Sequence, residues 1–342
     1  SYDDDRSLSL EQEEILLSYL AGDMPEGDPA DATPEQPVDE FMPDLLLEMP
    51  EAYQPQLSPD DYRCFLVPWP AELDQVRYVT GFNIFPGERS IVHHVITFAA
   101  APEQAAAFQA LDDAEPGPGY TCFGGPGGPM GQARWVGAWV PGAGVFTAPP
   151  GVGMAIDPGS LLIMQVHYNS APGNTLSDRS SMGLALTDSV ERRGEILPLA
   201  NIGWVTGNVP MTIPAGDADV THEFSLAHDS PFLKIALLDK LGADPGTPLL
   251  VWRAGLHMHL FGQRGRVEVR HADSSASCLA DVPRWDFNWQ GAFWYQTPID
   301  LEPNQPMRLS CTYDSMERDG TTYWGDSTQD EMCLSFFYVT RR

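Results

Sequence analysis

The sequence predicts an all-β protein: two antiparallel, jelly-roll-like β-sandwich domains in tandem, with a short helical extension at the N-terminus. The chain has 342 residues, which is too long for one typical domain core and sufficient for two. Gly and Pro, at 31 residues each, exceed their average usage and favour turns and short strands over long helices. The apolar runs are strand-sized and far too short to span a membrane.

Residues 1–50 are an acidic, proline-rich extension with one predicted helix. We expect this helix over Leu8–Leu20, with Ser9 as N-cap and Gln12 completing a capping box. The segment that follows, P-E-G-D-P-A-D-A-T-P-E-Q-P, has the composition of a linker. Because the chain begins at Ser1 with no visible signal peptide, we expect a mature or trimmed product.

From Asp61 onward the pattern is that of short strands separated by Pro and Gly, with little helical periodicity. The clearest predicted strands are Arg77–Ile84, Ser90–Ala99, Leu161–Asn169, Leu249–Phe261, Gly265–Arg270 and Leu334–Thr340. This pattern is typical of sandwiches and not of βαβ units.

An internal repeat indicates that the two sandwiches are related. Ile156–Ser170 and Ile299–Ser315 both contain a proline turn, a strand and an aromatic-polar exit. Each is preceded, in its own half, by a strand with paired histidines. The alternative is a chance similarity of strand ends. We expect a first sandwich over residues 51–198 and a second over residues 199–342.

The net charge of −29 restricts the partners of this protein. Nucleic acid and anionic membrane surfaces are excluded, because their phosphates would be repelled. The charge otherwise provides solubility or salt tolerance, or attracts cationic partners such as metal ions or an electron donor.

Five cysteines are present, and none forms the C-x-x-C pair of a zinc ribbon, a thioredoxin motif or a c-type haem attachment site. Two disulfides and one free thiol would suit an oxidising compartment, and the residues themselves leave the pairing open. We therefore expect a secreted or periplasmic protein. The cysteines are Cys64, Cys122, Cys278, Cys311 and Cys333.

Paired histidines in two predicted strands have the character of metal ligands. His257 and His259 are two residues apart, so on a strand both imidazoles lie on one face, and Met258 points into the core. His93 and His94 are adjacent, so both reach one ion only if the backbone bulges or the rings use different nitrogens. For each motif the alternative is a buried histidine held by hydrogen bonds.

Two further residues extend these motifs. His167, in M-Q-V-H-Y-N, provides a fifth imidazole. Met332, in D-E-M-C-L-S-F-F, indicates the metal, because a thioether is a soft ligand that suits Cu(I) and suits zinc, magnesium or iron poorly. Taken alone, a methionine in a strand is usually a core residue.

The motifs D-Y-R-C, V-H-H-V, Q-V-H-Y, H-M-H, C-T-Y and D-E-M-C occur in an order and at a spacing that resemble one family. It is the copper type II, ascorbate-dependent monooxygenases, which include peptidylglycine α-hydroxylating monooxygenase and dopamine β-monooxygenase. The resemblance runs from about Asp61 to the C-terminus. It implies two coppers per chain, and hydroxylation of a substrate C–H bond with O2 and a one-electron reductant such as ascorbate.

The resemblance also implies which residues hold each copper. An electron-storing copper is assigned to His93, His94 and His167. A second copper, which meets O2 and substrate, is assigned to His257, His259 and Met332, the catalytic candidates. The implied disulfides are Cys64–Cys122 and Cys311–Cys333, and Cys278 is left as a buried free thiol.

At the positions that bind substrate, the chain departs from the peptide-amidating members of the family. Those members use an arginine before the H-x-H motif, and an asparagine and a tyrosine after the methionine, to bind a peptide carboxylate. Here the three positions hold Gly255, Leu334 and Phe336, and Arg253 lies two residues further along the strand. We expect a small or apolar substrate near Leu334, Phe336 and Arg253, and no peptide amidation.

The N-terminal helix and its acidic tail resemble the end of a bacterial c-type cytochrome domain, a module fused ahead of bacterial members of the family. A c-type cytochrome is therefore a candidate electron donor. Because the chain has no C-x-x-C-H motif, it cannot hold haem covalently. Either a haem-binding part lies upstream, or the helix docks on the sandwich.

The alternative function is a non-catalytic periplasmic protein that binds or carries copper. Oxygen uptake that depends on a reductant and yields a product would favour the enzyme. Tight copper binding without oxygen consumption would favour the carrier. A structural adhesion module is a weaker alternative, because it would not need six ligands of this kind.

Overall fold

The computed structural model describes residues 8–24, 26–28, 41–129, 131–141, 144–287 and 290–342. Most of the predicted linker, residues 29–40, lies outside these ranges. The described residues form sheets of nine, five and four strands, which confirms the predicted all-β class with its short N-terminal helix. No helix among these residues is long and apolar enough to cross a membrane.

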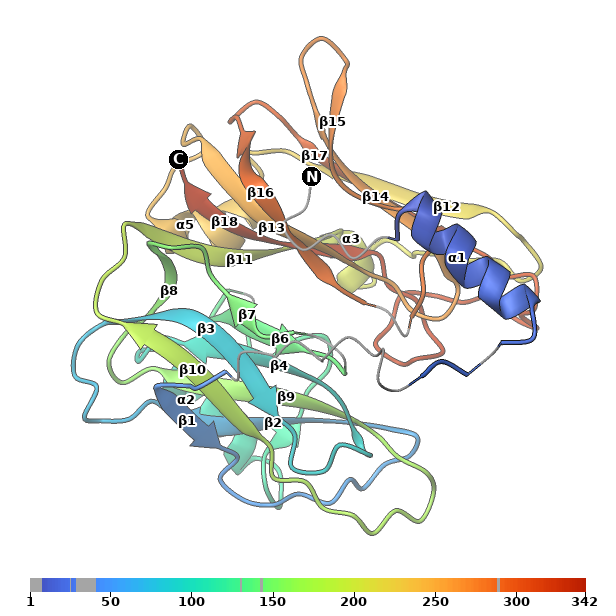
Figure 1. Ribbon diagram of the computed structural model, residues 1–342. Helices are drawn as coiled ribbons and strands as arrows, with labels where there is room; N and C mark the ends of the chain where they lie inside the picture. The colour runs from blue at the N-terminus through green and yellow to red at the C-terminus, as the bar shows by residue number, and fades with distance from the viewer. Residues whose placement is uncertain (1–7, 25, 29–40, 130, 142–143, 288–289) are drawn as a thin grey trace.

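The first half of the chain forms a sandwich, the lower, blue-to-green part of Figure 1. One of its layers is the five-stranded sheet, with the order β5 (Tyr120–Thr121), β2 (Asp60–Pro68), β9 (Leu161–Asn169), β4 (Val92–Ala100) and β6 (Ala133–Trp139). The facing layer is part of the nine-stranded sheet: β1 (Leu45–Glu48), β10 (Ser181–Thr187), β3 (Arg77–Phe85), β8 (Val152–Ile156) and β7 (Phe146–Thr147). Alternate residues of both layers meet in one apolar core, which includes Phe65, Val79, Val95, Met154 and Val166.

The second half forms the yellow-to-red sandwich above it. Its four-stranded sheet has the order β12 (Val220–Leu226), β17 (Met307–Tyr313), β14 (Gly262–Arg270) and β15 (Ala276–Val282). The rest of the nine-stranded sheet faces it: β11 (Arg192–Ala200), β18 (Leu334–Arg341), β13 (Leu249–His257) and β16 (Ala292–Leu301). A second core between these layers includes Leu197, Val251, Val267, Leu309 and Phe337.

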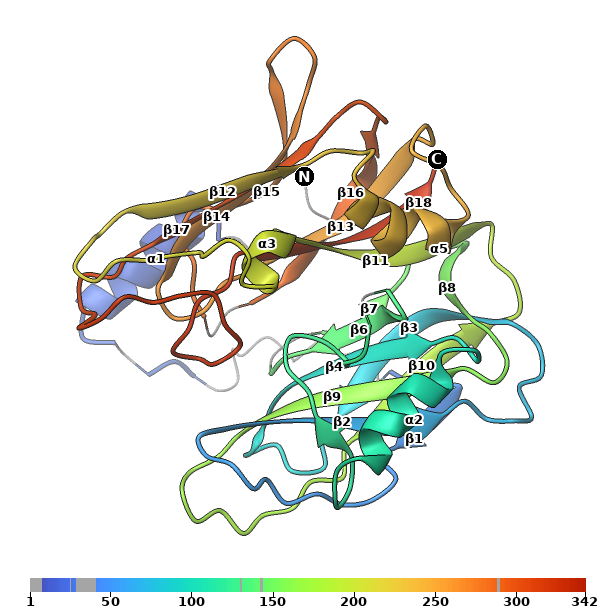
Figure 2. The same ribbon diagram turned by 180° about the vertical axis from the view of Figure 1, so that it is seen from behind.

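The nine-stranded sheet runs through both halves of the molecule. β11 lies where the two halves meet, as Figures 1 and 2 show from opposite sides. It pairs with β18 over seven residues and with β8 only at Arg192 and Arg193. The predicted domain boundary, between residues 198 and 199, falls inside β11. The division into two domains at that residue stays a prediction.

The two repeated stretches of the sequence form equivalent strands, β9 and β17. Each strand lies within the outer sheet of its own sandwich, with neighbours on both sides. Each ends in a fully buried tyrosine whose hydroxyl donates a hydrogen bond, Tyr168 to Asp178 Oδ2 at 3.1 Å and Tyr313 to the Met332 carbonyl at 2.8 Å. The second of these bonds fixes the backbone of a predicted metal ligand.

Helices are short. The predicted N-terminal helix is α1 (Leu10–Ala21), and its Ser9–Gln12 capping box is confirmed by both reciprocal hydrogen bonds. None of its residues is buried. The remaining helices are α2 (Ala105–Asp113), α3 (Ile202–Val205), α4 (Pro231–Leu233), a π-helical segment η2 (Lys234–Leu238) and α5 (Asp239–Leu241).

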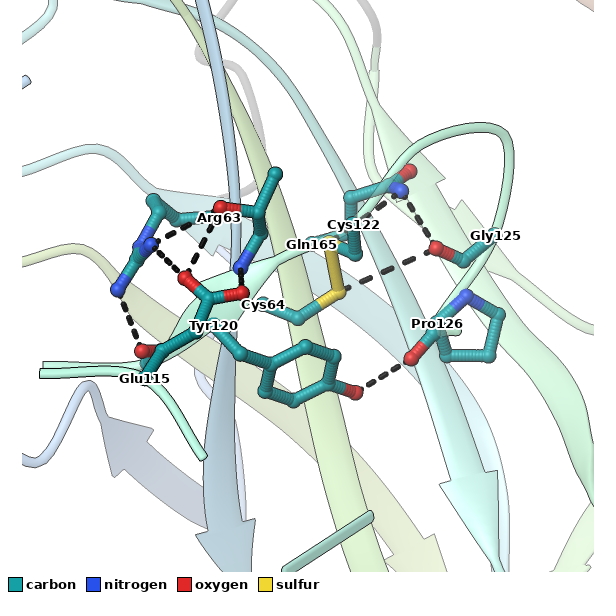
Figure 3. Close-up of a disulfide and its surroundings, with 10 residues drawn as sticks. Arg63, Cys64, Glu115, Tyr120, Cys122, Gly125, Pro126 and Gln165 are labelled. Carbon is teal, nitrogen blue, oxygen red and sulfur yellow. Dashed lines mark hydrogen bonds and ion pairs between the residues drawn. A yellow bond between two sulfur atoms is a disulfide. The ribbon is translucent and has the colours of Figure 1, made fainter. Parts of the chain in front are cut away.

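The two disulfides are those that the family resemblance implies. Cys64–Cys122 joins β2 to the segment after β5, and the amide of Gln165 on β9 donates to the Gly125 carbonyl beside it (Figure 3). Cys311–Cys333 joins β17 to the residue before β18. The expectation of a buried Cys278 is wrong: this thiol is exposed, because it lies on β15, a strand at the edge of its sheet.

A buried ion pair joins the two halves of the molecule. Arg134 Nη1 on β6 lies 2.7 Å from Glu195 Oε1 on β11, and their side chains are only 12% and 1% exposed. The second partner of Glu195, Arg193 Nε, is more distant at 3.3 Å. A carboxylate so deeply buried is costly unless it is paired.

We therefore expect Arg134→Met to lower the free energy of unfolding by about 3–5 kcal/mol, measured by denaturant unfolding. The control is Arg266→Met. The side chain of Arg266 is 47% exposed, and its pairs with Glu268 and Asp281 should contribute about 1 kcal/mol or less. Equal losses in the two variants would contradict the structural role given to the buried pair.

Candidate metal centre

A β-bulge brings the first three histidines together. The pairing of β4 with β9 shifts register between Val92 and His94, so His93 is the extra residue. His94 then lies directly opposite His167. The Nδ1 atom of His94 lies 3.2 Å from that of His93 and 3.3 Å from that of His167. One ligand atom from each ring lies within 4.8 Å of the others, which is a geometry suited to one metal ion.

Two neighbouring residues that are not ligands fix the orientation of the His167 ring. Its Nε2 lies 2.9 Å from Asp60 Oδ1, and its ring stacks on Tyr62 with centroids 4.0 Å apart. The hydrogen bond from His167 lowers the pKa of Asp60, which therefore stays ionised. Since a carboxylate only accepts, Nε2 carries the proton and Nδ1 is left as the ligand atom.

The second pair of histidines uses the other ring nitrogen. His257 ends β13, His259 follows two residues later, and their ring centroids lie 5.1 Å apart. His257 Nδ1 lies 2.6 Å from Gln290 Oε1, and His259 Nδ1 lies 3.1 Å from the Asp330 carbonyl oxygen. Both partners are acceptors in these contacts, so each Nδ1 donates and each Nε2 is the free ligand atom.

Met332 precedes the β13–β18 ladder by two residues, and its backbone lies near that of His259, because the N–H groups of both residues donate to Glu331 Oε2. The last pair of the β13–β18 ladder is His257 with Leu334, and extending this antiparallel register by two residues would place Met332 opposite His259. Residues that face each other in this way point to the same side of a sheet. This register would set Met332 on the same side as both histidines of the second group.

The side chain of Met332 is buried, but it does not pack within the main apolar clusters. It is 8% exposed, and it is absent from all three hydrophobic clusters of the described residues. Met258, by contrast, is fully buried in the core of the second sandwich, as predicted from its position between the two histidines. A buried thioether outside the apolar clusters favours the ligand interpretation of Met332 over the packing interpretation.

Glu331 holds the two arms of the second group together, and the sequence analysis missed it. Its carboxylate accepts from the backbone N–H groups of His259 at 2.9 Å, Phe261 at 2.6 Å and Met332 at 3.1 Å. Burial raises the pKa of this carboxyl to about 7, which the amide hydrogen bonds partly oppose. The sequence gives little signal for this role, because Glu331 directly follows the polar residues Gln329 and Asp330.

Burial also keeps the predicted ligands neutral. Desolvation lowers the pKa of His93 and of His259 to about 4, that of His257 to about 3, and that of His94 well below its usual value. Neutral imidazoles are the form that binds metal, so these rings need lose no proton to bind an ion at pH 7. The donor sets, three imidazoles in one group and two imidazoles with a thioether in the other, suit copper.

The three candidate substrate residues lie in different surroundings. Leu334 pairs with His257 on the same side of the sheet. The ring of Phe336 covers Gly255, where a side chain would collide with it. The guanidinium of Arg253 contacts the rings of Phe146 and Trp294, at 5.5 and 5.2 Å from their centroids, and donates to the Ala292 carbonyl at 3.3 Å.

The remaining three histidines belong to neither group. His222 Nε2 lies 2.8 Å from the Thr212 carbonyl, and His271 contacts Ser277 and Gln305. His228 is buried without a hydrogen-bond partner among the described residues. The structure thus gathers into two groups the same five histidines that the sequence analysis selected.

Each histidine group is oriented by a hydrogen-bond partner that is not itself a ligand. Removing that partner should weaken copper binding at that group alone. We expect Gln290→Ala to weaken copper binding at the His257 group by about 10–100-fold and Asp60→Ala to do the same at the His93 group. Each variant is the control for the other, and copper titration followed by equilibrium dialysis measures both sites. A uniform loss at both sites in either variant would contradict these assignments.

The sequence of the chain is similar to those of known copper monooxygenases. Residues 245–340 match the family described as "Copper type II ascorbate-dependent monooxygenase, C-terminal domain". The chain is 27% identical to mouse DBH-like monooxygenase protein 1, over 73% of the chain and 39% of that protein. It is 22% identical to dog dopamine beta-hydroxylase, over 59% of the chain and 31% of that protein.

A third relative is peptidyl-glycine alpha-amidating monooxygenase A of Xenopus laevis, which is 21% identical over 57% of the chain and 19% of its own length. The chain therefore spans about two-fifths, or less, of the length of the three relatives compared here. All three alignments cover more than half of the chain and extend beyond the C-terminal domain alone.

Proposed function

Since the chain belongs to the copper type II ascorbate-dependent monooxygenase family, we propose that it hydroxylates a C–H bond of a small or apolar substrate, using O2 and a one-electron reductant such as ascorbate. In this proposal two coppers bind per chain. The electron-storing copper is held by His93, His94 and His167, and the copper that meets O2 and substrate by His257, His259 and Met332. The division of the chain into two copper-binding domains is part of the same proposal.

The position of Met332 carries the proposal. Its side chain is 8% exposed, and continuing the β13–β18 register by two residues would set Met332 opposite His259. A site of two neutral imidazoles and one thioether favours Cu(I), the oxidation state that reacts with O2. When bound, copper would supply the one-electron transfers that O2 reduction requires. The other residues of the site would bind the substrate, orient the ligands and exclude water.

Several of these residues orient the ligands. Glu331 ties the backbone of Met332 to that of His259, and Tyr313 donates to the Met332 carbonyl. The Cys311–Cys333 disulfide fixes the adjacent residue. Three independent restraints on one short segment favour a preorganised thioether ligand, because an unrestrained methionine side chain has many conformations.

Apolar side chains support the choice of substrate. Leu334 pairs with His257, and Phe336 fills the space above Gly255 and packs at 6.0 Å against Trp135 of the first sandwich. These side chains exclude water and offer no partner for a substrate carboxylate. Arg253 is engaged with two aromatic rings, so we assign it a structural part at the interface between the halves.

We further propose that the protein works outside the cytoplasm, because its two disulfides are typical of oxidising compartments. The comparisons give no support for a c-type cytochrome as electron donor, and α1 buries no residue against the sandwich. Ascorbate or a similar small one-electron reductant is therefore the proposed donor.

The proposal is tested by incubating the copper-loaded protein with ascorbate, ¹⁸O₂ and an extract of small apolar metabolites. We expect a product that is heavier than its substrate by one ¹⁸O atom and that requires both copper and ascorbate. The Met332→Leu variant is the control and should form much less of it. Tight copper binding with no oxygen uptake would instead indicate the carrier function.

A further inference from the structure

An aromatic side chain contacts both histidine groups. Phe287 belongs to the segment that joins β15 to β16. Its ring stacks on that of His93, with centroids 5.9 Å apart and planes inclined by 20°, and meets His259 edge to face at 6.1 Å and 86°. His93 belongs to the first group and His259 to the second, so one phenyl ring contacts ligands of both.

The segment that carries Phe287 is fastened to the second group. Trp285 Nε1 donates to the His259 carbonyl at 3.0 Å. Gln290 Nε2 donates to the Phe287 carbonyl at 2.9 Å, and the Oε1 atom of the same amide accepts from His257 Nδ1 at 2.6 Å. Contacts on both sides of Phe287 thus hold its backbone, and its ring extends from the second sandwich to the first.

The chemistry of this side chain restricts what can pass between the two groups. Two metal ions that face each other across open space can share a water-derived ligand or a small anion. A phenyl ring offers no donor atom, and a ring packed against ligands of both groups reduces the space that such a ligand would need. It also excludes the water that would form the bridge.

We propose that Phe287 is a positioning residue that keeps the two copper ions apart and prevents them from sharing a bridging ligand. This role rests on the proposed function, because it requires an ion in each histidine group. Its consequence is that each ion exchanges one electron at a time and the two do not act as a coupled pair. No residue of either ligand set is assigned this role, so it can be tested without removing a ligand.

The test is a spin count by electron paramagnetic resonance on the Cu(II)-loaded protein, with and without azide, a small anion that bridges copper ions. The wild-type protein should show two spins per chain in both conditions. Phe287→Ala should bind two coppers but fall below one spin per chain with azide, because a bridge couples the two spins. Phe287→Leu, which keeps much of the volume, should retain more spins than the alanine variant.

The matched control is Phe123→Ala. Phe123 is exposed and packs against Tyr62 at 5.4 Å beside the first group, but it has no place between the groups. This variant should keep two spins per chain with azide. Its behaviour separates the loss of a spacer from the loss of any nearby aromatic ring.

Two spins per chain in Phe287→Ala with azide would overturn the proposal, as would spin loss in the wild-type protein. If the alanine variant holds fewer than two coppers, Phe287→Val decides, because valine removes the ring and most of its reach: an undiminished count there with azide also overturns the proposal. Copper analysis of the wild-type protein tests the proposed function separately. Fewer than two coppers in that sample would refute the two-site function, and with it the need for a spacer.

Discussion

His257→Ala is expected to remove one of two copper equivalents per chain and to lower hydroxylation by more than about 100-fold. The loss should exceed the cost of removing an outer partner of a ligand, about 10–100-fold, because the ligand itself is lost. The first group should keep its copper, since its three Nδ1 atoms converge independently of β13. Copper analysis and product formation measure the two effects on one sample.

His271→Ala is the control for this prediction. His271 lies outside both groups and contacts Ser277 and Gln305, so the variant should keep both coppers and full activity. Loss of both coppers in His257→Ala would mean that the five histidines form one shared site. Retention of both would remove His257 from the ligand set.

Met332→His should keep copper bound and lower turnover by about 100-fold or more. A third imidazole is a stronger donor to Cu(II) than a thioether, so the variant should stabilise the oxidised ion and slow its reaction with O2. If Met332 were only a packing residue, copper affinity and turnover would hardly change. The free energy of unfolding would then fall, because a polar ring would be buried without a partner.

Met258→His is the matched control, since Met258 lies between His257 and His259 and is buried within the core of the second sandwich. It should lower the free energy of unfolding by about 1–3 kcal/mol and leave copper binding unchanged. Turnover and denaturant unfolding then distinguish the two variants: Met332→His should lower turnover, whereas Met258→His should mainly lower the free energy of unfolding. Identical patterns would remove the distinction between ligand and core methionine.

The strands were largely predictable because their pattern is local. The predicted strand Leu161–Asn169 matches β9 residue for residue, and the predicted Leu334–Thr340 ends one residue before β18 does. The helix α2 was not predicted, although its sequence A-A-A-F-Q-A-L-D-D is rich in alanine. Its position depends on Phe108, which packs into a third apolar cluster that also contains Cys64 and Cys122.

The candidate ligands were predictable as residue types, but their arrangement was not. The sequence analysis required a bulge or different nitrogens for His93 and His94, and the structure contains the bulge. Which nitrogen faces the metal depends on Asp60 and Gln290, which lie 107 and 33 residues away from the histidines that they orient. Separations of this size leave no local pattern, so only the tertiary fold identifies such partners.

The candidate substrate residues illustrate the same limit. Leu334 and Phe336 lie on β18, and Arg253 lies on the neighbouring strand β13. From the sequence, all three were expected near the substrate. The long side chain of Arg253 instead packs against two neighbouring aromatic rings, Phe146 and Trp294, from different halves of the molecule. Its direction is set by that stacking and not by its spacing from the histidines.

The central claim is a copper site with a thioether ligand, and X-ray absorption at the copper edge of the ascorbate-reduced protein tests it most directly. We expect two coppers per chain, one of them with a sulfur atom at a copper–sulfur bonding distance. This sulfur scattering should be lost in Met332→Leu and kept in Met258→Leu. A reduced wild-type sample that holds two coppers but lacks copper–sulfur scattering would contradict the account.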